Sequence, residues 1–213
     1  MNRLFLVRHG ITEANHLGVY QGQTDIPLSA KGRLQIAALR ERLRDERFAA
    51  CYSSVLARAR VSAEILLEEH FCPLRATPDL NEVSYGAWEG LTRAQVQERF
   101  PEAWAYFVED PTRHAAPGGE TRPQLQARVG RVLAEIADQF EDASILIASH
   151  GGTLREMIGC YLNLPAEEIW KLRLDNASLS IVDAYAGGGV LTLFNDTAHL
   201  GPRKPALGGE PVH

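Results

Sequence analysis

The chain has 213 residues, of which 45% are hydrophobic and 23% charged, and its formal net charge is −5. These values are typical of a globular protein with one domain and a sizeable core. The acidic balance argues against a nucleic-acid-binding protein, which needs a basic surface. Any cations that hold an anionic ligand must therefore be clustered locally.

Localisation signals are scarce in this sequence. No apolar stretch reaches the length of a membrane span, and Arg8 interrupts the N-terminal apolar run too early for a secretory signal. Cys51, Cys72 and Cys160 are odd in number and widely spaced, which favours neither a disulfide framework nor a zinc site. We therefore expect a cytoplasmic protein with reduced thiols that binds no membrane.

The segment up to residue 70 predicts two strands and two helices. The apolar runs at 3–7 and 49–53 predict buried strands, the second less clearly because it contains Cys51 and Tyr52. Ser29 can cap the first helix, and residues 56–70 predict the second. The side chains that these helices should turn inward are Ile36, Leu39 and Leu43 in the first, and Val61, Ile65 and Leu66 in the second.

The hydrophobic pattern changes twice in the middle of the chain. Residues 71–120 have little periodicity and several turn signals, so we expect an insertion over one end of the sheet. Residues 121–140 carry the clearest helical period in the sequence. Their apolar positions predict a core-facing stripe without a ligand-binding role: Leu125, Val129, Val132, Leu133, Ile136 and Phe140.

The C-terminal part returns to short apolar runs. Residues 144–149 predict a third buried strand, and a helix should follow from near Thr153 to about Leu162. Two further strands, 177–184 and 190–195, are joined through three consecutive glycines, which predicts a hairpin and at least one antiparallel strand. The tail 201–213 is rich in proline and glycine and should pack weakly.

Strands that alternate with helices predict an α/β fold with right-handed crossovers and a mostly parallel central sheet. We expect residues 1–200 to form a single domain that includes the insertion at about 71–120. The tail 201–213 would lie outside that domain.

Cationic and imidazole side chains follow the three predicted parallel strands. Arg8 and His9 come after the first, Arg58 after the second and His150 after the third. Taken alone, Arg58 is an ordinary solvated helix residue, and either histidine is an ordinary hydrogen-bonded structural residue. Because open α/β sheets bind ligands beyond the carboxyl ends of their strands, the coincidence favours an anion site.

The residue types suit a phosphoryl group, which carries about two negative charges near neutral pH. Guanidinium groups bind its oxygens bidentately, and "HGG" at 150–152 offers backbone N–H groups at a helix start. A neutral imidazole can attack phosphorus and carry it covalently, while a second donates to the equatorial oxygens. We expect Gly10 to let the backbone turn close to the phosphate.

The reaction also needs a carboxylate that exchanges protons with the leaving alcohol and with water. The stretch "LNEVSYGAWEG" at 80–90 supplies Glu82 and Glu89 among loop residues. The residue pattern by itself does not choose between them.

Six motifs together resemble the phosphoglycerate-mutase-like branch of the histidine phosphatase superfamily, and within it the small bacterial phosphatases of phosphoserine and α-ribazole type. They occur in the family's order and are "LVRHGITEAN" at 6–15, "YQGQTDIPLSAKG" at 20–32, "SSVLARA" at 53–59, "LNEVSYGAWEG" at 80–90, "PGGET" at 117–121 and "SHGG" at 149–152. Each motif is weak alone, whereas six in order are specific.

The resemblance implies a role for each matching residue. His9 is implied to be the phosphohistidine nucleophile and Glu82 the proton donor, while Arg8, Arg58 and His150 complete the phosphate pocket. The residues implied to lie near the bound phosphate or substrate are Asn15, Gln21, Gly22 and Gly151. The implied fold is a three-layer α/β/α sandwich, and the family's chemistry requires no metal or other cofactor.

The chain departs from the family in one place. After Arg58 the family commonly has Gln-Thr three to four residues on, whereas this chain has "RARVSAE". Ser62 can replace the threonine hydroxyl there, so the packing behind the pocket differs while its charges do not.

The resemblance implies a phosphatase that acts on a small phosphorylated metabolite, and it allows a homodimer. A phosphoglycerate-type mutase would use the same intermediate, but the mutases resembled are usually longer than this compact chain. A non-catalytic protein that binds a phosphorylated ligand is disfavoured because the full residue set is present. A metallohydrolase is disfavoured because the sequence has neither a His-Glu-x-x-His nor a Cys-x-x-Cys pattern.

The sequence does not identify the phosphomonoester: phosphoserine, a phosphoglycerate, α-ribazole phosphate and a sugar phosphate are all compatible with these motifs. Specificity should come from the loops at 16–24 and 85–120. Their candidate entrance residues, each more simply a packing or surface side chain, are His16, Tyr20, Tyr85, Trp88, Trp104, Tyr106 and His114.

Overall fold

The structure is a computed structural model that describes residues 1–202. Most of the tail predicted at 201–213 therefore lies outside the described residues. Six strands form one sheet in the spatial order β3-β2-β4-β1-β5-β6. They are β1 (Asn2–Arg8), β2 (Ala50–Ser54), β3 (Leu74–Thr77), β4 (Ser144–Ser149), β5 (Leu179–Tyr185) and β6 (Gly188–Asp196).

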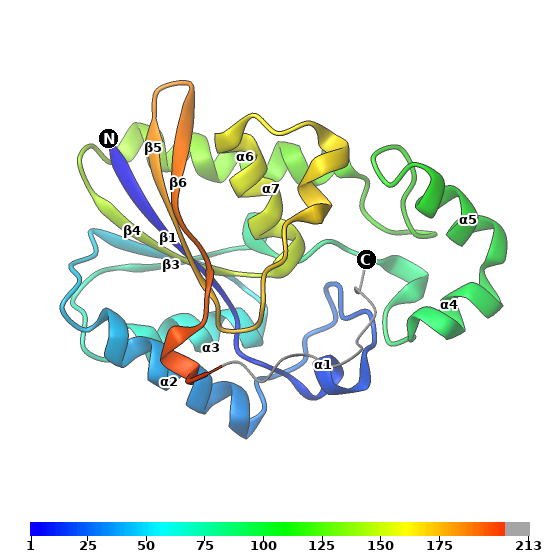
Figure 1. Ribbon diagram of the computed structural model, residues 1–213, viewed down its shortest axis with the longest axis horizontal. Helices are drawn as coiled ribbons and strands as arrows, with labels where there is room; N and C mark the ends of the chain where they lie inside the picture. Colours follow the sequence, from blue (N-terminus) through cyan, green and yellow to red (C-terminus); the bar gives the residue numbers. More distant parts are fainter. Residues whose placement is uncertain (203–213) are drawn as a thin grey trace.

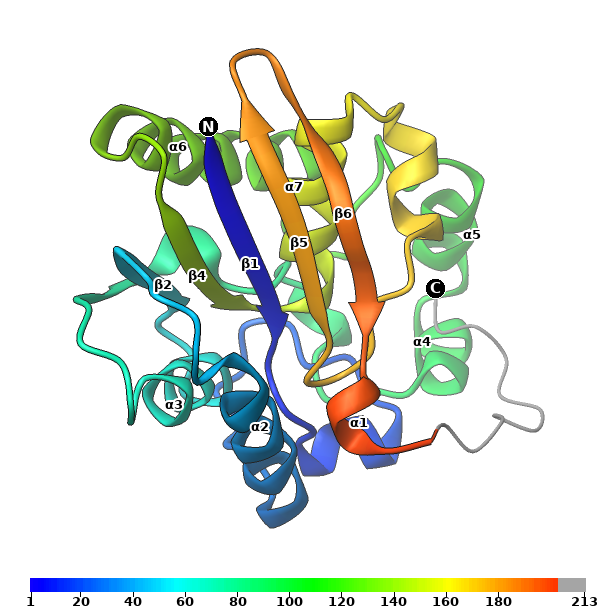
Figure 2. The ribbon, with the colours of Figure 1, turned by 60° about the vertical axis from the view of Figure 1, so that its left-hand side comes forward.

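The sheet is mostly parallel, as the sequence predicts. β1 pairs with β4, and β2 with both β3 and β4, in parallel register, whereas β5 runs antiparallel to β1 and to β6. Arg8 lies opposite Ser149 in that register, so β1 and β4 end side by side. Figure 2 shows these strands next to one another, with the β5–β6 hairpin at one edge.

Helices cover both faces of the sheet and give three layers. α2 (Ala30–Leu43) and α3 (Ala57–Leu66) pack on one face, and α6 (Arg122–Gln139) and α7 (Gly151–Leu162) pack on the other. Side chains along β1 alternate between the two cores: Leu4 and Leu6 lie with α6 and α7, while Phe5 and Val7 lie with α2 and α3. A strand buried on both faces is apolar throughout, which is why residues 4–7 form a continuous apolar run, whereas Arg3 before them is exposed.

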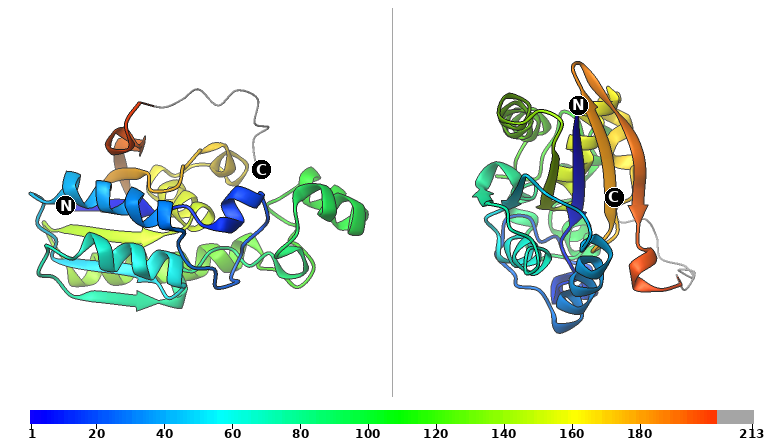
Figure 3. Two further views of the ribbon diagram at one scale, coloured as in Figure 1. Left: turned by 90° about the horizontal axis from the view of Figure 1, so that it is seen from below. Right: turned by 90° about the vertical axis from the view of Figure 1, so that its left-hand side faces the viewer.

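The insertion between β3 and α6 lies beyond the carboxyl end of β1 and carries two helices, α4 (Arg93–Arg99) and α5 (Pro101–Glu109) (Figure 1; Figure 3, left). A small separate core holds it together, with Trp88 and Val96 fully buried and Trp104 and Phe107 packed against them. Two short 3-10 helices precede α4: η1 (Pro78–Leu80) and η2 (Gly86–Trp88).

One predicted boundary differs, because β3 falls inside the range 71–120 that the sequence assigns to the insertion. This edge strand has only four residues, and none of them is fully buried. Its sequence "LRAT" therefore has no apolar run that would mark it as a strand, and the insertion begins only after Thr77.

The predicted helices are present with small shifts at their ends. The Ser29 hydroxyl accepts from the Gly32 N–H at 3.1 Å and caps α2 as expected. α7 begins at Gly151 rather than near Thr153, because His150 is its N-cap residue. Three short elements have no apolar period to predict them: α1 (Glu13–Leu17), η3 (Ala166–Lys171) and η4 (Ala198–Leu200). Within residues 1–202, no helix is long and apolar enough to cross a membrane.

Candidate active site

A cavity of about 320 Å³ opens at the carboxyl ends of the parallel strands, and we call it the strand-end cavity. Eight of the nine site residues named from the sequence line it: Arg8, His9, Asn15, Gln21, Gly22, Arg58, Glu82 and Gly151. The ninth, His150, lies behind this lining and is fully buried. Its ring centroid is 5.1 Å from that of His9.

The hydrogen bonds of His9 fix the position of its proton. Its Nδ1 lies 2.7 Å from the Gly10 carbonyl oxygen, which can only accept, so Nδ1 carries the proton. Nε2 is then left with its lone pair. Burial, followed by the charges of Arg8 and Arg58, holds the pKa of His9 well below the ordinary value of 6.5. The imidazole is therefore neutral near pH 7, which is the nucleophilic form.

His150 has the opposite tautomer. The Nε–H of Arg58 donates to His150 Nδ1 at 3.2 Å, so the proton of the neutral ring is on Nε2. Burial, then His9 and the nearby arginines, lowers the pKa of His150 well below 6.5. The other nitrogens of Arg58 donate to the carbonyls of Gly22 at 2.6 Å and Thr24 at 2.8 Å, which aims the guanidinium.

Two buried donors near His9 have no hydrogen-bond partner within residues 1–202: Nε of Arg8 and Nε2 of His150. The Arg8 side chain is tied down elsewhere, because its NH1 donates to the Leu174 carbonyl at 2.5 Å. An unpaired buried donor costs about 1–3 kcal/mol, so proteins seldom keep two together without a use. An anion bound beside His9 would satisfy both.

The Glu82 carboxylate sits on the N-terminus of α7. It accepts from the backbone N–H of Gly152 at 3.0 Å, from that of Thr153 at 3.3 Å and from that of Val83 at 3.0 Å. A Cβ on Gly152 would lie 2.6 Å from Glu82 Oε1, so any larger residue there would displace the carboxylate. The carboxylate thereby occupies the second and third N–H groups of the helix, next to the strand-end cavity.

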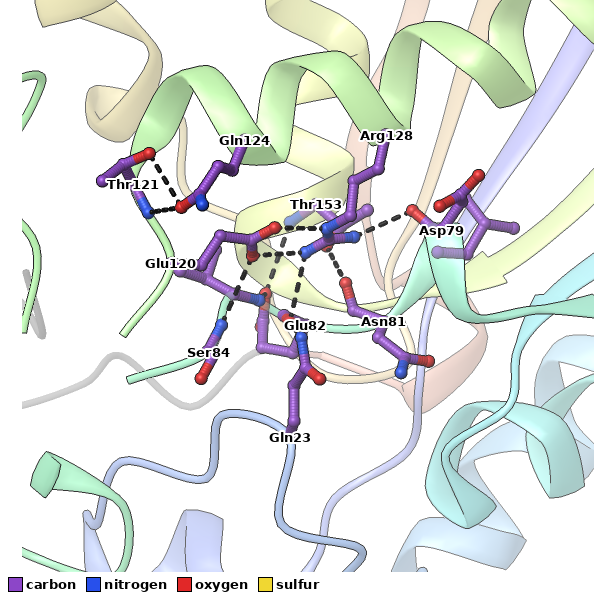
Figure 4. A network of polar contacts seen from close by, with 12 residues as sticks. Gln23, Asp79, Asn81, Glu82, Ser84, Glu120, Thr121, Gln124, Arg128 and Thr153 are labelled. Carbon is purple, nitrogen blue, oxygen red and sulfur yellow. Dashed lines mark hydrogen bonds and ion pairs between the residues drawn. The ribbon is translucent and has the colours of Figure 1, made fainter. Parts of the chain in front are cut away.

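A buried ion pair holds the backbone of Glu82 (Figure 4). Arg128 of α6 donates to both oxygens of Glu120, at 2.6 and 2.8 Å, and its NH2 also donates to the Glu82 carbonyl at 3.2 Å. From the other side, Gln23 Nε2 donates to the same carbonyl at 3.2 Å. Glu82 is thus positioned by α6 and by the loop that carries Gly22.

Glu89, the other candidate carboxylate, has a different position. It does not line the strand-end cavity but accepts from the N–H groups of Gln23 and Thr24, both at 2.9 Å, and of Tyr85 at 3.1 Å. A Cβ on Gly22 would lie 2.0 Å from Glu89 Oε1, and Gly22 has a φ of +49°. Glu89 therefore shapes the loop whose carbonyls orient Arg58.

The structure adds a packing requirement for Gly10 that the sequence did not predict. A Cβ there would lie 2.4 Å from the Gly32 carbonyl oxygen, so the glycine is required by the packing of this turn against α2. Ser62 does occupy the place expected for it behind the pocket. Its hydroxyl accepts from the Gly10 N–H at 3.3 Å and donates to the Arg58 carbonyl at 2.7 Å.

Three polar side chains that line the strand-end cavity were not predicted from the sequence: Arg93, Arg155 and Asn176. Asn176 Nδ2 donates to the His9 carbonyl at 3.2 Å and to Asn15 Oδ1 at 3.3 Å. Nothing local in "DNASLS" signals this contact, which spans 167 residues of sequence. Arg155 follows Gly151 by four positions on α7 and so shares its face, a spacing that sequence reasoning could have used.

The proposed entrance residues divide into three groups. Tyr20 and Tyr85 line the strand-end cavity, and His114 lines a neighbouring one. Trp88 is fully buried, and Trp104 packs against it in the core of the insertion. His16 and Tyr106 do not line the strand-end cavity. Within the described part of the chain, no three histidine, cysteine, aspartate or glutamate side chains cluster as metal ligands.

Fold and cavity together define an α/β protein that places two neutral imidazoles beside the guanidinium groups of Arg8 and Arg58 at the carboxyl edge of a mostly parallel sheet. This chain belongs to the histidine phosphatase superfamily (branch 1), whose family model matches residues 4–197.

Several known proteins are similar over nearly their whole length. The adenosylcobalamin/α-ribazole phosphatase of Salmonella typhimurium is 34% identical over 197 residues, which cover 92% of this chain and 97% of the relative. Phosphoserine phosphatase 1 of Hydrogenobacter thermophilus is 31% identical over 201 residues, or 94% and 95% of the two chains. A mycobacterial glucosyl-3-phosphoglycerate phosphatase, solved with VO3, superimposes with a TM-score of 0.84 at 32% identity, covering 92% and 99%.

Proposed function

We propose that this protein is a phosphatase that hydrolyses a small phosphomonoester through a covalent phosphohistidine on His9, with Glu82 as the proton donor. One observation carries the proposal: a neutral His9, with its lone pair on Nε2, lies beside two buried donors that lack partners within residues 1–202. Family membership and the phosphatase activity named for its relatives support the reaction class.

In the proposed complex, the phosphate lies among Arg8, Arg58 and His150. The backbone N–H of Gly151, the first residue of α7, points with the helix dipole toward the same place. Residues that line the rest of the strand-end cavity would contact the phosphate or its ester oxygen: Asn15, Gln21 and Gly22.

The first chemical step forms a phosphorus–nitrogen bond. Nε2 of His9 attacks phosphorus, the bond from phosphorus to the ester oxygen breaks, and the protonated Glu82 carboxyl gives its proton to the departing alkoxide. Negative charge spreads over the equatorial oxygens, where the guanidinium groups and the Nε2–H of His150 stabilise it.

The second step returns the enzyme to its starting state. Water attacks the phosphohistidine, the phosphorus–nitrogen bond breaks, and the Glu82 carboxylate takes the proton that the water loses. The products over both steps are one alcohol and one orthophosphate. We also propose a cytoplasmic location, where the three thiols would stay reduced.

The test is phosphate release from a panel of phosphomonoesters, compared by kcat/KM, alongside conversion of 3- to 2-phosphoglycerate. We expect release that persists in a strong chelator and that falls at least about 10⁴-fold in His9→Gln, the usual scale for a lost nucleophile. Conversion without release would instead identify a mutase. Saturable binding of the esters without turnover would identify a binding protein.

A further inference from the structure

A second cavity of about 130 Å³ adjoins the strand-end cavity, and we call it the side cavity. The two share Tyr85, Gly152 and Arg155 in their linings. Because the Gly152 N–H binds the Glu82 carboxylate, this boundary lies next to the proposed proton donor. The two cavities are therefore adjacent, and an ester whose phosphate is beside His9 would reach the side cavity by extending its organic group past Tyr85.

Apolar side chains from separate elements converge on the side cavity. They come from the loop after η1, from α5, from α6 and from η3: Val83, Phe107, Leu125, Ile169 and Trp170. An apolar cavity of about 150 Å³ holds a benzene ring in another protein, so the space here matches roughly one ring.

Charged groups at the side cavity are largely engaged by the protein itself. Glu156, whose side chain is only 2% exposed, pairs with Arg122 Nε at 3.2 Å, and Arg122 also donates to the Ala166 carbonyl. Glu120 is held by Arg128, and the Nε–H of Arg155 donates to the Leu172 carbonyl at 2.7 Å. The ion pairs of Glu120 and Glu156 neutralise those groups, so they do not select for a charged ligand. Arg155 bonds a neutral carbonyl and keeps its positive charge at the boundary between the two cavities.

On the basis of the proposed function, we infer that the side cavity is the subsite for the substrate's organic group. The substrate class is then a phosphomonoester whose alcohol carries an apolar ring of about the size of benzene. A small phosphorylated amino acid or hydroxy acid would leave this subsite empty and lose the contacts with Ile169 and Trp170.

The experiment compares ω-phenylalkyl phosphates of increasing linker length with n-alkyl phosphates of the same linker. Both series have similar primary alcohols as leaving groups, so differences in kcat/KM report the ring and not the chemistry. At the linker length that reaches the side cavity, we expect the ring to raise kcat/KM about 10- to 100-fold, the scale of a small apolar contact in a binding pocket.

A substitution that fills the side cavity tests whether the preference for the ring arises there. Ala166 lines the side cavity, so Ala166→Phe should abolish the preference for the ring while n-alkyl phosphates are still hydrolysed. The matched control is Glu167→Phe, which places the same side chain at an exposed neighbouring position outside the lining and should keep the preference. Trp170→Ala, which removes a side chain that is 41% exposed, should weaken the preference without disturbing the fold.

Binding gives a readout that is independent of turnover. A phenylalkyl phosphonate should bind His9→Gln about 10-fold more tightly than its alkyl counterpart by calorimetry, and Ala166→Phe should remove that difference. Release of phosphate that depends on His9 but shows no ring preference at any linker length would overturn the subsite and leave the proposed function standing. Absence of release from both series would remove the proposed function, and the subsite with it.

Discussion

Arg58 donates its Nε–H to Nδ1 of His150 at 3.2 Å, and neither side chain is exposed to solvent. Because a guanidinium keeps its protons, this bond makes Nδ1 an acceptor and puts the imidazole proton on Nε2. A residue at the start of α3 thereby sets the hydrogen-bonding state of the N-cap residue of α7.

Arg58→Lys should lower kcat/KM by about 10²- to 10³-fold, the usual scale for a misplaced donor to a transition state. A lysine ammonium cannot bond His150 and the two loop carbonyls, of Gly22 and Thr24, in one planar arrangement. Steady-state kinetics of phosphate release measure the effect. Arg60→Lys, two positions along α3 and exposed, is the control and should change nothing.

His9 and His150 should both remain neutral at about pH 6, since burial and nearby arginines lower their pKa values well below 6.5. Nitrogen-15 NMR of the imidazoles, with His9→Gln and His150→Gln to assign the signals, measures this directly. The spectra should also show the proton on Nδ1 in His9 and on Nε2 in His150. A titration near 6.5 for either ring would contradict the account.

The same pKa shifts make stability depend on pH. The folded pKa of each histidine lies below its unfolded value, so the unfolded chain takes up protons first as the pH falls below about 6.5. The free energy of unfolding should therefore decrease from about pH 7 toward pH 5. His150→Gln should reduce that dependence in urea titrations, and an unchanged slope would argue against a buried neutral His150.

Arg128→Met should destabilise the fold by about 3–5 kcal/mol, because it leaves the Glu120 carboxylate buried without its partner. Arg131→Met is the matched control on the same helix. Arg131 pairs with Asp79 while its side chain is 63% exposed, so its loss should cost less than about 1 kcal/mol. Urea unfolding compares the two variants. Equal losses of unfolding free energy would show that the buried ion pair stabilises the fold no more than the exposed one.

Glu82→Gln and Glu89→Gln should both lower the rate of hydrolysis, but with different dependence on the leaving group. If Glu82 protonates the leaving alcohol, its loss should slow alkyl phosphates by about 10²- to 10⁴-fold but p-nitrophenyl phosphate much less, because nitrophenolate leaves without a proton. Glu89 orders the loop of Gln23 and Thr24, so its loss should affect both leaving groups alike. Equal sensitivity of Glu82→Gln to both would remove its role as proton donor.

Local patterns predicted the layers of this fold well. Ile36, Leu39 and Leu43 recur at helical spacing and are all buried in α2, and the apolar run at 144–149 is a strand buried on both faces. Such segments can be recognised in the sequence because the side chains that face the core recur at the period of the helix or strand. β3 was missed because an edge strand of four partly exposed residues imposes no such period.

The site residues that escaped prediction depend on contacts between distant segments. Asn176, which was not predicted, contributes through a bond to the His9 carbonyl. Gly10 was predicted, but its packing against the Gly32 carbonyl was not. Neither contact leaves a trace in the neighbouring sequence. The residues that follow the strands were easier to predict as site residues. Parallel strands bring their carboxyl ends to one edge of the sheet, whatever segments connect them.

If phosphorus is carried on Nε2 of His9, enzyme trapped during turnover should contain an acid-labile phosphohistidine at that position. Wild-type protein is mixed with a phosphorus-32 phosphomonoester, quenched in alkali within one turnover, digested and mapped by mass spectrometry. We expect a phosphoenzyme that is stable to alkali and labile to acid, with the label on His9, and no label in His9→Gln. Full turnover with no trapped phosphoenzyme, or a label on another residue, would contradict it.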